Sequence, residues 1–284
     1  MKNTTVSIIG LGRVGTAFLR VLSEHGYEVT SVFNRSEIDE DLSRQFPETT
    51  FYTGLPTRDD QTGNLLIISV TDDAIEGVVE HLKKEYKSLE ELQVVHCSGT
   101  HTSNILKPLK EKGAAIASFH PIKSITPETK DFSGTWFDIE GDEELEDDLS
   151  LICNDIGAQS FTVSPDTKPL LHISAVVASN YLVVLAGLAS QISSKEVSEE
   201  VLLKALTPLM RNTLDNINEL GTEKALTGPV VRGDVETIKE HLDLLKSSPE
   251  VRDLYKMLGA EALNISRRAN GETPEYDKIE EMLS

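Results

Sequence analysis

The feature that most constrains this chain is a glycine-rich turn between a short apolar segment and an amphipathic segment. Residues 6–9 (VSII) predict a buried strand, residues 10–15 read GLGRVG, and apolar residues then recur with helical spacing up to Leu22. In such a GxGxxG turn the first glycine permits the tight bend, the second admits a pyrophosphate, and the third allows close helix packing. Free N–H groups at the helix N-terminus would hold the pyrophosphate. We predict a dinucleotide site formed by Gly10, Leu11, Gly12, Arg13, Val14 and Gly15.

The residues after the second predicted strand, Glu28–Phe33, indicate which dinucleotide is bound. NAD-selective sites usually carry Asp or Glu there to bind the ribose 2′-hydroxyl, whereas this chain has Asn34, Arg35 and Ser36. Arg35 can pair with a 2′-phosphate or stack on adenine, and its two neighbours can donate hydrogen bonds to the phosphate. The pattern favours NADP(H). The alternative is that Arg35 is only a solvated loop residue.

Composition narrows the class of protein. The chain has 284 residues, 39% hydrophobic and 26% charged, which is typical of a soluble globular protein with two domains. Its formal net charge of −20 argues against nucleic acid or anionic membrane as a partner. Cys97 and Cys153 are too few for a disulfide framework, and no ligand spacing suggests a metal. Residues 2–5 are too polar for a signal peptide, and the apolar stretch Ile173–Leu188 is too short for a membrane span. These features predict a reduced, cytoplasmic protein.

The two halves of the chain have different patterns. The first half alternates strand and helix signals, as in a parallel sheet covered by helices, with strands predicted at 6–9, 28–33, 51–52, 65–70, 93–97, 114–120, 136–140 and 159–163. After Ser164 only helices are predicted, at 170–193, 198–220, 234–246 and 249–268. We therefore predict an α/β fold, with a doubly wound nucleotide-binding domain at 1–164 and an all-helical domain at 165–284.

Seven segments in a fixed order resemble a known family. They read GLGRVG, NRS, VTDDAI, HCSGT, SFHPIKS, HISAVVASNYL and LTGPVVRGD. Together they resemble Rossmann-like proteins with a DUF2520 domain, a family often labelled as NADP oxidoreductases, over essentially the whole chain. More distantly, the chain is similar to the group of β-hydroxyacid dehydrogenases, pyrroline-carboxylate reductases, ketopantoate reductases and prephenate dehydrogenases. The resemblance implies a small-molecule substrate between the nicotinamide and the helical domain, and a homodimer formed through the helices.

Two polar residues end neighbouring predicted strands and are candidate catalytic residues. Hydride transfer at a carbon that bears oxygen requires a proton donor or acceptor beside that oxygen. The resemblance to prephenate dehydrogenases implies that His120 is the acid or base and that Ser98 is its hydrogen-bond partner. The alternatives are a histidine bonded to backbone and a serine that only forms a turn. His96, within a strand, is expected to be structural, and His101 to lie on a surface loop.

His172 and Asn180 lie eight residues apart on the first long predicted helix, so both could face one direction. The β-hydroxyacid dehydrogenases carry a catalytic lysine four residues before the asparagine of this helix. Val176 occupies that position here, so the lysine mechanism does not transfer. Asn180 could bind substrate or the nicotinamide amide, or form a structural bond between helices. His172 could replace the missing proton donor, or merely begin the helix.

The loop at 226–234 supplies the candidate substrate contacts. Arg232 suits a substrate carboxylate or phosphate through bidentate hydrogen bonds, although a salt bridge to Asp234, the predicted N-cap of the next helix, is the alternative. Thr227 is a further candidate contact. The nicotinamide would be flanked by Val70, Thr71 and Ser98.

Taken together, these features predict an NADP-dependent oxidoreductase that acts on a small anionic substrate. One alternative is a non-catalytic NADP(H)-binding sensor or scaffold, which the absence of the lysine allows. A second is a prephenate- or arogenate-type dehydrogenase. The residues after the His-Pro pair argue against the second alternative, because Ile-Lys-Ser replaces the usual glycine-containing turn.

Overall fold

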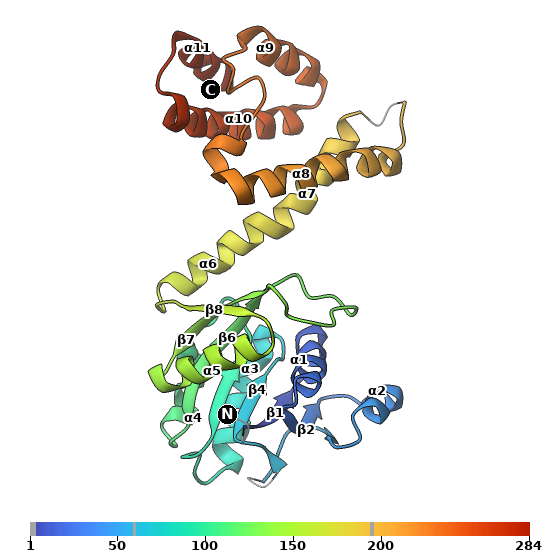
Figure 1. Ribbon diagram of the computed structural model, residues 1–284, viewed down its shortest axis with the longest axis vertical. Coiled ribbons are helices and arrows are strands. Elements are labelled where there is room, and N and C mark those ends of the chain that lie inside the picture. Colours follow the sequence, from blue (N-terminus) through green and yellow to red (C-terminus); the bar gives the residue numbers. More distant parts are fainter. Residues whose placement is uncertain (1–3, 59–60, 194–195) are drawn as a thin grey trace. The chain divides into compact units, whose positions relative to one another are not determined.

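The computed structural model describes residues 4–58, 61–193 and 196–284, so the start of the polar N-terminal segment, residues 1–3, lies outside it. The chain divides into two compact units, Met1–Asn180 and Tyr181–Ser284 (Figure 1). The first contains the sheet and the second is helical. The predicted fold class, a doubly wound α/β domain followed by a helical domain, is confirmed.

One sheet of eight strands organises the first unit, in the order β3-β2-β1-β4-β5-β6-β7-β8. All eight predicted strands are present, with ends within two residues of those expected. Their bounds are β1 Thr5–Ile9, β2 Glu28–Asn34, β3 Thr50–Thr53, β4 Leu65–Ile68, β5 Gln93–His96, β6 Ala115–Ile122, β7 Trp136–Gly141 and β8 Gln159–Thr162. From β1 the chain first adds β2 and β3 on one side of that strand, and it then returns to add β4 on the other side. The carboxyl ends of β1 and β4 therefore form the topological switch point, where open α/β sheets bind ligands.

The expectation of a wholly parallel sheet is wrong at one pair of strands. β7 runs antiparallel to β6, and this register places Asp138 opposite His120. The connection between the two strands, residues 123–135, contains no helix. Without a crossover helix a strand returns beside its predecessor in the opposite direction. The antiparallel return brings the middle of β7 beside the end of β6.

Helices cover both faces of this sheet. Those in the first unit are α1 Arg13–Glu24, α2 Glu40–Gln45, α3 Asp72–Glu85, α4 Lys107–Lys110 and α5 Glu143–Asp155, together with the 3₁₀ turn Ser103–Leu106. The helix α3 begins after its N-cap residue Thr71 with two aspartates, Asp72 and Asp73. Their carboxylates lie in the first turn, where the helix dipole favours negative charge.

Two apolar clusters fix these helices to the sheet. On β1, Ile8 packs in the cluster that holds α1 and α5, whereas Ile9 packs in the cluster that holds α3 and α4. This alternation follows the two-residue period of a strand. In the first cluster the ring of Phe18 on α1 lies 5.1–6.1 Å, centroid to centroid, from three phenylalanines of the sheet and its connections. Burial of one such side chain contributes about 2 kcal/mol, so α1 is firmly placed behind the glycine-rich turn.

The first long helix is interrupted by a wider turn. It begins at α6 Thr167–Ala175, passes through the π-helical segment Val176–Asn180, and continues as α7 Tyr181–Ile192. Because flanking residues join the apolar stretch, the run Thr167–Ile192 is long and apolar enough to cross a membrane by length and composition. The shorter stretch Ile173–Leu188, which Ser174, Ser179 and Asn180 interrupt, was expected to fall short of a membrane span. Core helices of soluble proteins meet the same criterion.

The second unit contains the remaining helices, α8 Glu199–Ala225, α9 Val235–Leu244, α10 Pro249–Asn270 and α11 Pro274–Leu283, and the 3₁₀ turn Leu245–Ser247. The helix α8 contains a break at Gly221, where φ is 75°. Asp234 caps α9 as predicted, since its carboxylate accepts a hydrogen bond from the Thr237 N–H. The helix α11 was not predicted. Thr273 caps it, and it buries Tyr276.

Candidate functional site

A cavity of about 560 Å³ opens at the carboxyl ends of β1, β2 and β4. It lies at the switch point of the sheet, where a dinucleotide was expected. Seven of the predicted cofactor residues line it, namely Gly10, Leu11, Gly12, Asn34, Arg35, Val70 and Thr71. Arg13 borders an adjoining cavity of about 260 Å³, which Leu11 and Gly12 also line. Val14 packs partly buried against the core, and Gly15 is buried.

The three glycines of the turn have different surroundings. A Cβ atom on Gly15 would lie 1.9 Å from the carbonyl oxygen of Gly10, and one on Gly10, where φ is +100°, would lie 2.9 Å from the carbonyl oxygen of Ser69. The fold itself therefore requires these two glycines. A Cβ on Gly12 would meet no atom within 4 Å. The open space beside Gly12 fits the close approach of a pyrophosphate to the backbone, which is the role that the motif gives to its second glycine.

Asn34 joins the glycine-rich turn to the loop after β2. Its Oδ1 atom accepts a hydrogen bond of 3.2 Å from the Leu11 N–H, and its Nδ2 atom donates to the carbonyl oxygen of Ser36 at 3.1 Å. The side chain of Asn34 therefore helps to fix the shape of the cavity. Arg35 is exposed beside it, and its guanidinium is free of ion pairs among the described residues. A cation at this position is suited to an anionic group in the cavity.

Ser98 forms a turn after β5. Its Oγ atom accepts hydrogen bonds from the backbone N–H groups of Thr100 (3.2 Å) and His101 (3.1 Å). It does not bond to His120 in the described structure, so the expected Ser98–His120 pair is wrong and the alternative, a turn, is what forms. The sequence suggested the pair because both residues end strands. The Oγ atom instead stays with the nearer backbone donors of its own loop.

His96 has the structural role expected of it. The ring is buried, its Nδ1 accepts a hydrogen bond from the Ser98 N–H, and its Nε2 donates to the carbonyl oxygen of Thr102. Burial lowers the pKa of His96 to about 4. The imidazole is therefore neutral near pH 7 and supports the loop after β5. His101, in that loop, is partly buried.

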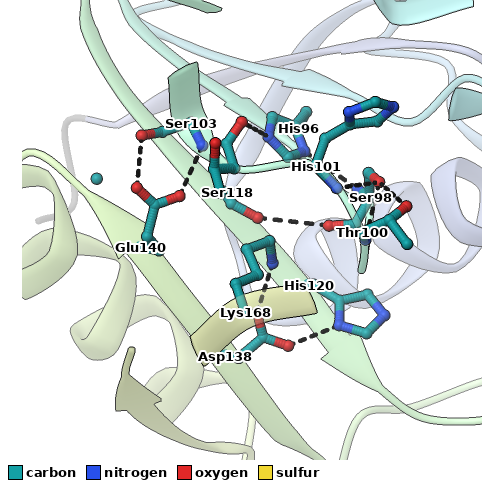
Figure 2. Close-up of polar contacts among 12 residues, drawn as sticks. His96, Ser98, Thr100, His101, Ser103, Ser118, His120, Asp138, Glu140 and Lys168 are labelled. Carbon is teal, nitrogen blue, oxygen red and sulfur yellow. Dashed lines mark hydrogen bonds and ion pairs between the residues drawn. The ribbon is translucent and has the colours of Figure 1, made fainter. Parts of the chain in front are cut away.

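His120 is bonded to a carboxylate that the sequence analysis did not single out. Its Nδ1 atom lies 2.6 Å from Oδ2 of Asp138, and Oδ1 of Asp138 lies 2.6 Å from Nζ of Lys168 (Figure 2). Lys168 is fully buried and Asp138 is almost so. Burial opposes ionisation of Asp138, but the hydrogen bonds and charges of His120 and Lys168 outweigh it and lower the pKa of the carboxyl. His120 is thus the exposed end of a buried Lys–Asp–His chain.

His172 meets His120 above Gly99. The two imidazole centroids are 6.4 Å apart, and a Cβ on Gly99 would lie 2.6 Å from Nδ1 of His172 and 2.9 Å from Nε2 of His120. His172 lies in the second turn of α6 and does not begin the helix as one alternative held. Its Nδ1 atom is buried and has no hydrogen-bond partner in the part of the chain that the structure describes. The two predicted histidines are therefore brought together.

The surroundings of Asn180 do not decide between its two predicted roles. It is exposed and ends the π-helical segment Val176–Asn180, and its side chain makes no hydrogen bond among the described residues. The expected alignment with His172 assumed 3.6 residues per turn, which does not hold across a π-helical turn. A contact with substrate and a bond between helices both stay predictions.

Arg232 and Thr227 lie in the second unit, and both are exposed. Nη2 of Arg232 is 3.8 Å from Oδ2 of Asp234, so the salt bridge considered as an alternative is present in a long, exposed form. Such pairs contribute little stability. A substrate-binding role for either residue stays a prediction.

Two signals in the sequence could have revealed Asp138 and Lys168. Asp138 stands between apolar neighbours in the strand WFDIE, where a buried carboxylate requires a partner. Lys168 precedes His172 by four residues, so both lie on one face of a helix. Neither signal identifies the partner without the antiparallel return of β7.

Comparison with known proteins agrees with this architecture. A model of the Rossmann-like domain matches residues 2–121, and a model of DUF2520, a domain of unknown function, matches residues 135–262. The two matches follow each other along the chain and together span most of it. Among curated proteins, none matches the sequence significantly.

Several solved structures share the fold over nearly the whole chain. A candidate NADP oxidoreductase from Bacteroides fragilis is 24% identical, with a TM-score of 0.71, over 92% of this chain and 98% of that one. A protein from Thermotoga maritima is 26% identical, with the same TM-score, over 93% and 98%. A reductive aminase from Aspergillus terreus, in complex with NADPH and ethyl levulinate, is 17% identical with a TM-score of 0.65, over 99% of each chain.

Proposed function

We propose that this chain is an NADP(H)-dependent oxidoreductase that transfers a hydride between NADP(H) and a small, anionic substrate. The observation that carries the proposal is the cavity at the switch point, with open space beside Gly12, the cation Arg35 at its rim and no carboxylate among its described lining residues. A carboxylate there would repel a 2′-phosphate. The NADPH-bound reductive aminase of the same fold supports the same cofactor.

The residues present fit this cofactor. The backbone of the turn from Gly10 to Gly15 and the side chain of Arg13 would hold the pyrophosphate, and Arg35 and Ser36 would hold the 2′-phosphate. Val70, Thr71 and Ser98 would flank the nicotinamide, which supplies or accepts the hydride when bound.

The proton needed for hydride transfer would pass through His120. Asp138 accepts the Nδ1 hydrogen, so Nε2 is the atom that gives or takes a proton at the substrate. His172 and Asn180 are proposed to contact the substrate, and Arg232 and Thr227 to bind its anionic group. The absence of a Ser98–His120 bond removes the main resemblance to prephenate dehydrogenases. We therefore do not retain that alternative.

We also propose a domain boundary at residue 164, a cytoplasmic location without nucleic-acid or membrane partners, and a homodimer formed through the helices. Large apolar side chains are exposed on α7 and α8, including Val183 and Leu209. Exposed apolar surface of this kind favours association. Light scattering during size-exclusion chromatography of the full chain, and of the Val183→Asp/Leu209→Asp variant, tests the dimer.

The first experiment is a fluorescence titration with NADPH and with NADH. The NADPH complex is then mixed with a library of 2-oxo, 3-oxo and imino acids. Selective binding of NADPH with oxidation by a library member supports the proposal. Selective binding without turnover across the library favours the non-catalytic sensor, and no binding of either nucleotide refutes the cofactor site.

A further inference from the structure

The pair formed by Asp138 and Lys168 is unusual for its burial. Both oxygens of the carboxylate are used, Oδ1 by Nζ of Lys168 and Oδ2 by Nδ1 of His120, and the lysine is fully buried (Figure 2). Removal of two charges from water costs more than an apolar pair of the same size. Stability therefore does not explain this pair, and its contact with His120 indicates another role.

The three residues come from three elements. His120 and Asp138 face each other across the antiparallel strands β6 and β7, and Lys168 reaches the same carboxylate from the first turn of α6. The side chain of His120 retains some exposure, whereas the other two are enclosed. Only the imidazole can reach a ligand.

We propose that Asp138 and Lys168 are positioning residues for His120, which the carboxylate holds in the Nδ1–H tautomer while the ammonium offsets the carboxylate's charge. The unprotonated Nε2 atom, which lies beside Gly99, is thereby left to accept a proton from a substrate. This inference rests on the proposed role of His120 as acid or base.

The free nitrogens of His120 and His172 both lie against Gly99. A Cβ atom there would be 2.9 Å from Nε2 of His120 and 2.6 Å from Nδ1 of His172, so only glycine fits beside the two rings. Nδ1 of His172 is buried without a hydrogen-bond partner in the described structure, and a buried polar nitrogen without a partner is costly.

Other titratable groups near His120 are accounted for. On β5, His96 is buried and neutral near pH 7, and His101 lies in the following loop. On α3, the carboxylate of Asp72 accepts a hydrogen bond from Thr100, and on β7 Glu140 accepts two from Ser103. The groups that contact His120 itself or its carboxylate are Asp138, Lys168 and His172.

The test is NMR of the full chain with ¹⁵N-labelled histidine side chains, without cofactor or substrate. In the native protein we expect neutral His120 to carry its hydrogen on Nδ1. Asp138→Asn should reduce the share of the Nδ1–H tautomer, and Lys168→Met, which removes the second partner of the carboxylate, should reduce it less. Lys110→Met, which removes an exposed lysine paired with Asp142, is the matched control and should change nothing.

A smaller share of the Nδ1–H tautomer in Asp138→Asn supports the proposal, because a pair that only stabilised the fold would leave the tautomer of His120 unchanged. A neutral His120 with its hydrogen on Nε2 in the native protein overturns it, as does an unchanged tautomer ratio in Asp138→Asn. The measurement on the native protein does not depend on whether any variant folds. If a single variant fails to fold, the double variant Lys168→Met/Asp138→Asn removes both charges together. None of these NMR measurements requires the protein to convert a substrate. A failed search for substrate therefore leaves this test intact, and a failed test leaves the cofactor site intact.

Discussion

His120 and Asp138 lie opposite each other in the antiparallel register of β6 and β7, with Nδ1 of the ring 2.6 Å from Oδ2 of the carboxylate. This pairing fixes the imidazole from the side away from Gly99. The remaining ring nitrogen, Nε2, lies against Gly99 and near the ring of His172. A residue held in this way is suited to proton transfer at one defined position.

Replacement of His120 should abolish turnover without loss of cofactor binding. For His120→Ala we expect kcat to fall by about 10²–10⁴-fold, the usual contribution of a general acid or base, and the dissociation constant for NADPH to stay unchanged. Steady-state kinetics with the substrate found in the library, and a parallel titration, provide the measurement. His101→Ala is the control in the neighbouring loop. Full activity of His120→Ala would exclude this residue as the acid or base.

Two substitutions in the glycine-rich turn should have different effects. Gly12→Val adds a side chain where no atom lies within 4 Å, so stability should hold while the affinity for NADPH falls by about tenfold or more. In Gly15→Ala the new Cβ would meet the carbonyl oxygen of Gly10, and the free energy of unfolding should fall by about 1–3 kcal/mol. Urea unfolding and nucleotide titration separate the two. Unchanged NADPH affinity in Gly12→Val would contradict the site.

Arg35 should distinguish NADPH from NADH. Removal of its guanidinium in Arg35→Ala should weaken NADPH binding by about tenfold, as expected for the loss of a charge-assisted hydrogen bond, and leave NADH binding almost unchanged. Titration with both nucleotides measures the ratio. Arg44→Ala on α2, which removes an exposed arginine paired with Glu40, controls for net charge. Equal losses for both nucleotides would show that Arg35 does not bind the 2′-phosphate.

His96 should make the protein less stable in mild acid. Burial lowers its pKa from 6.5 to about 4, so the unfolded chain binds a proton in this interval that the folded chain does not. Its contribution to stability is complete above pH 6.5 and declines as the pH falls toward 4, by about 3 kcal/mol in all. Urea unfolding between pH 7 and 4.5 measures the decline. In His96→Gln the decline should be shallower, and an identical slope in both proteins would contradict the assignment.

Local patterns predicted most of the fold. The turn from Gly10 to Gly15, the eight strands and the cap at Asp234 each depend on residues close in sequence, and all are present. The cofactor residues followed from the same motif because strand, turn and helix are contiguous. The helix α11 was missed although Thr273 and Pro274 form a usual start for a helix.

The part of the candidate site around His120 depends on contacts that no local pattern encodes. Asp138 meets His120 only because residues 123–135 form no crossover helix, which reverses β7. Lys168 meets Asp138 only because α6 packs on the same region of the sheet. The pair of Ser98 with His120 failed for the same reason, since two strand ends can be neighbours while their side chains bond elsewhere.

Because Lys168 is buried, its chemical reactivity also measures whether α6 remains on the sheet. An ammonium that is fully enclosed against Asp138 is protected from amine-reactive reagents as long as α6 remains on the sheet. Most other lysines of the chain lie on the surface and react freely. The rate at which a single peptide around Lys168 becomes acetylated therefore measures how often this helix detaches, and mass spectrometry can follow that rate as ligands are added.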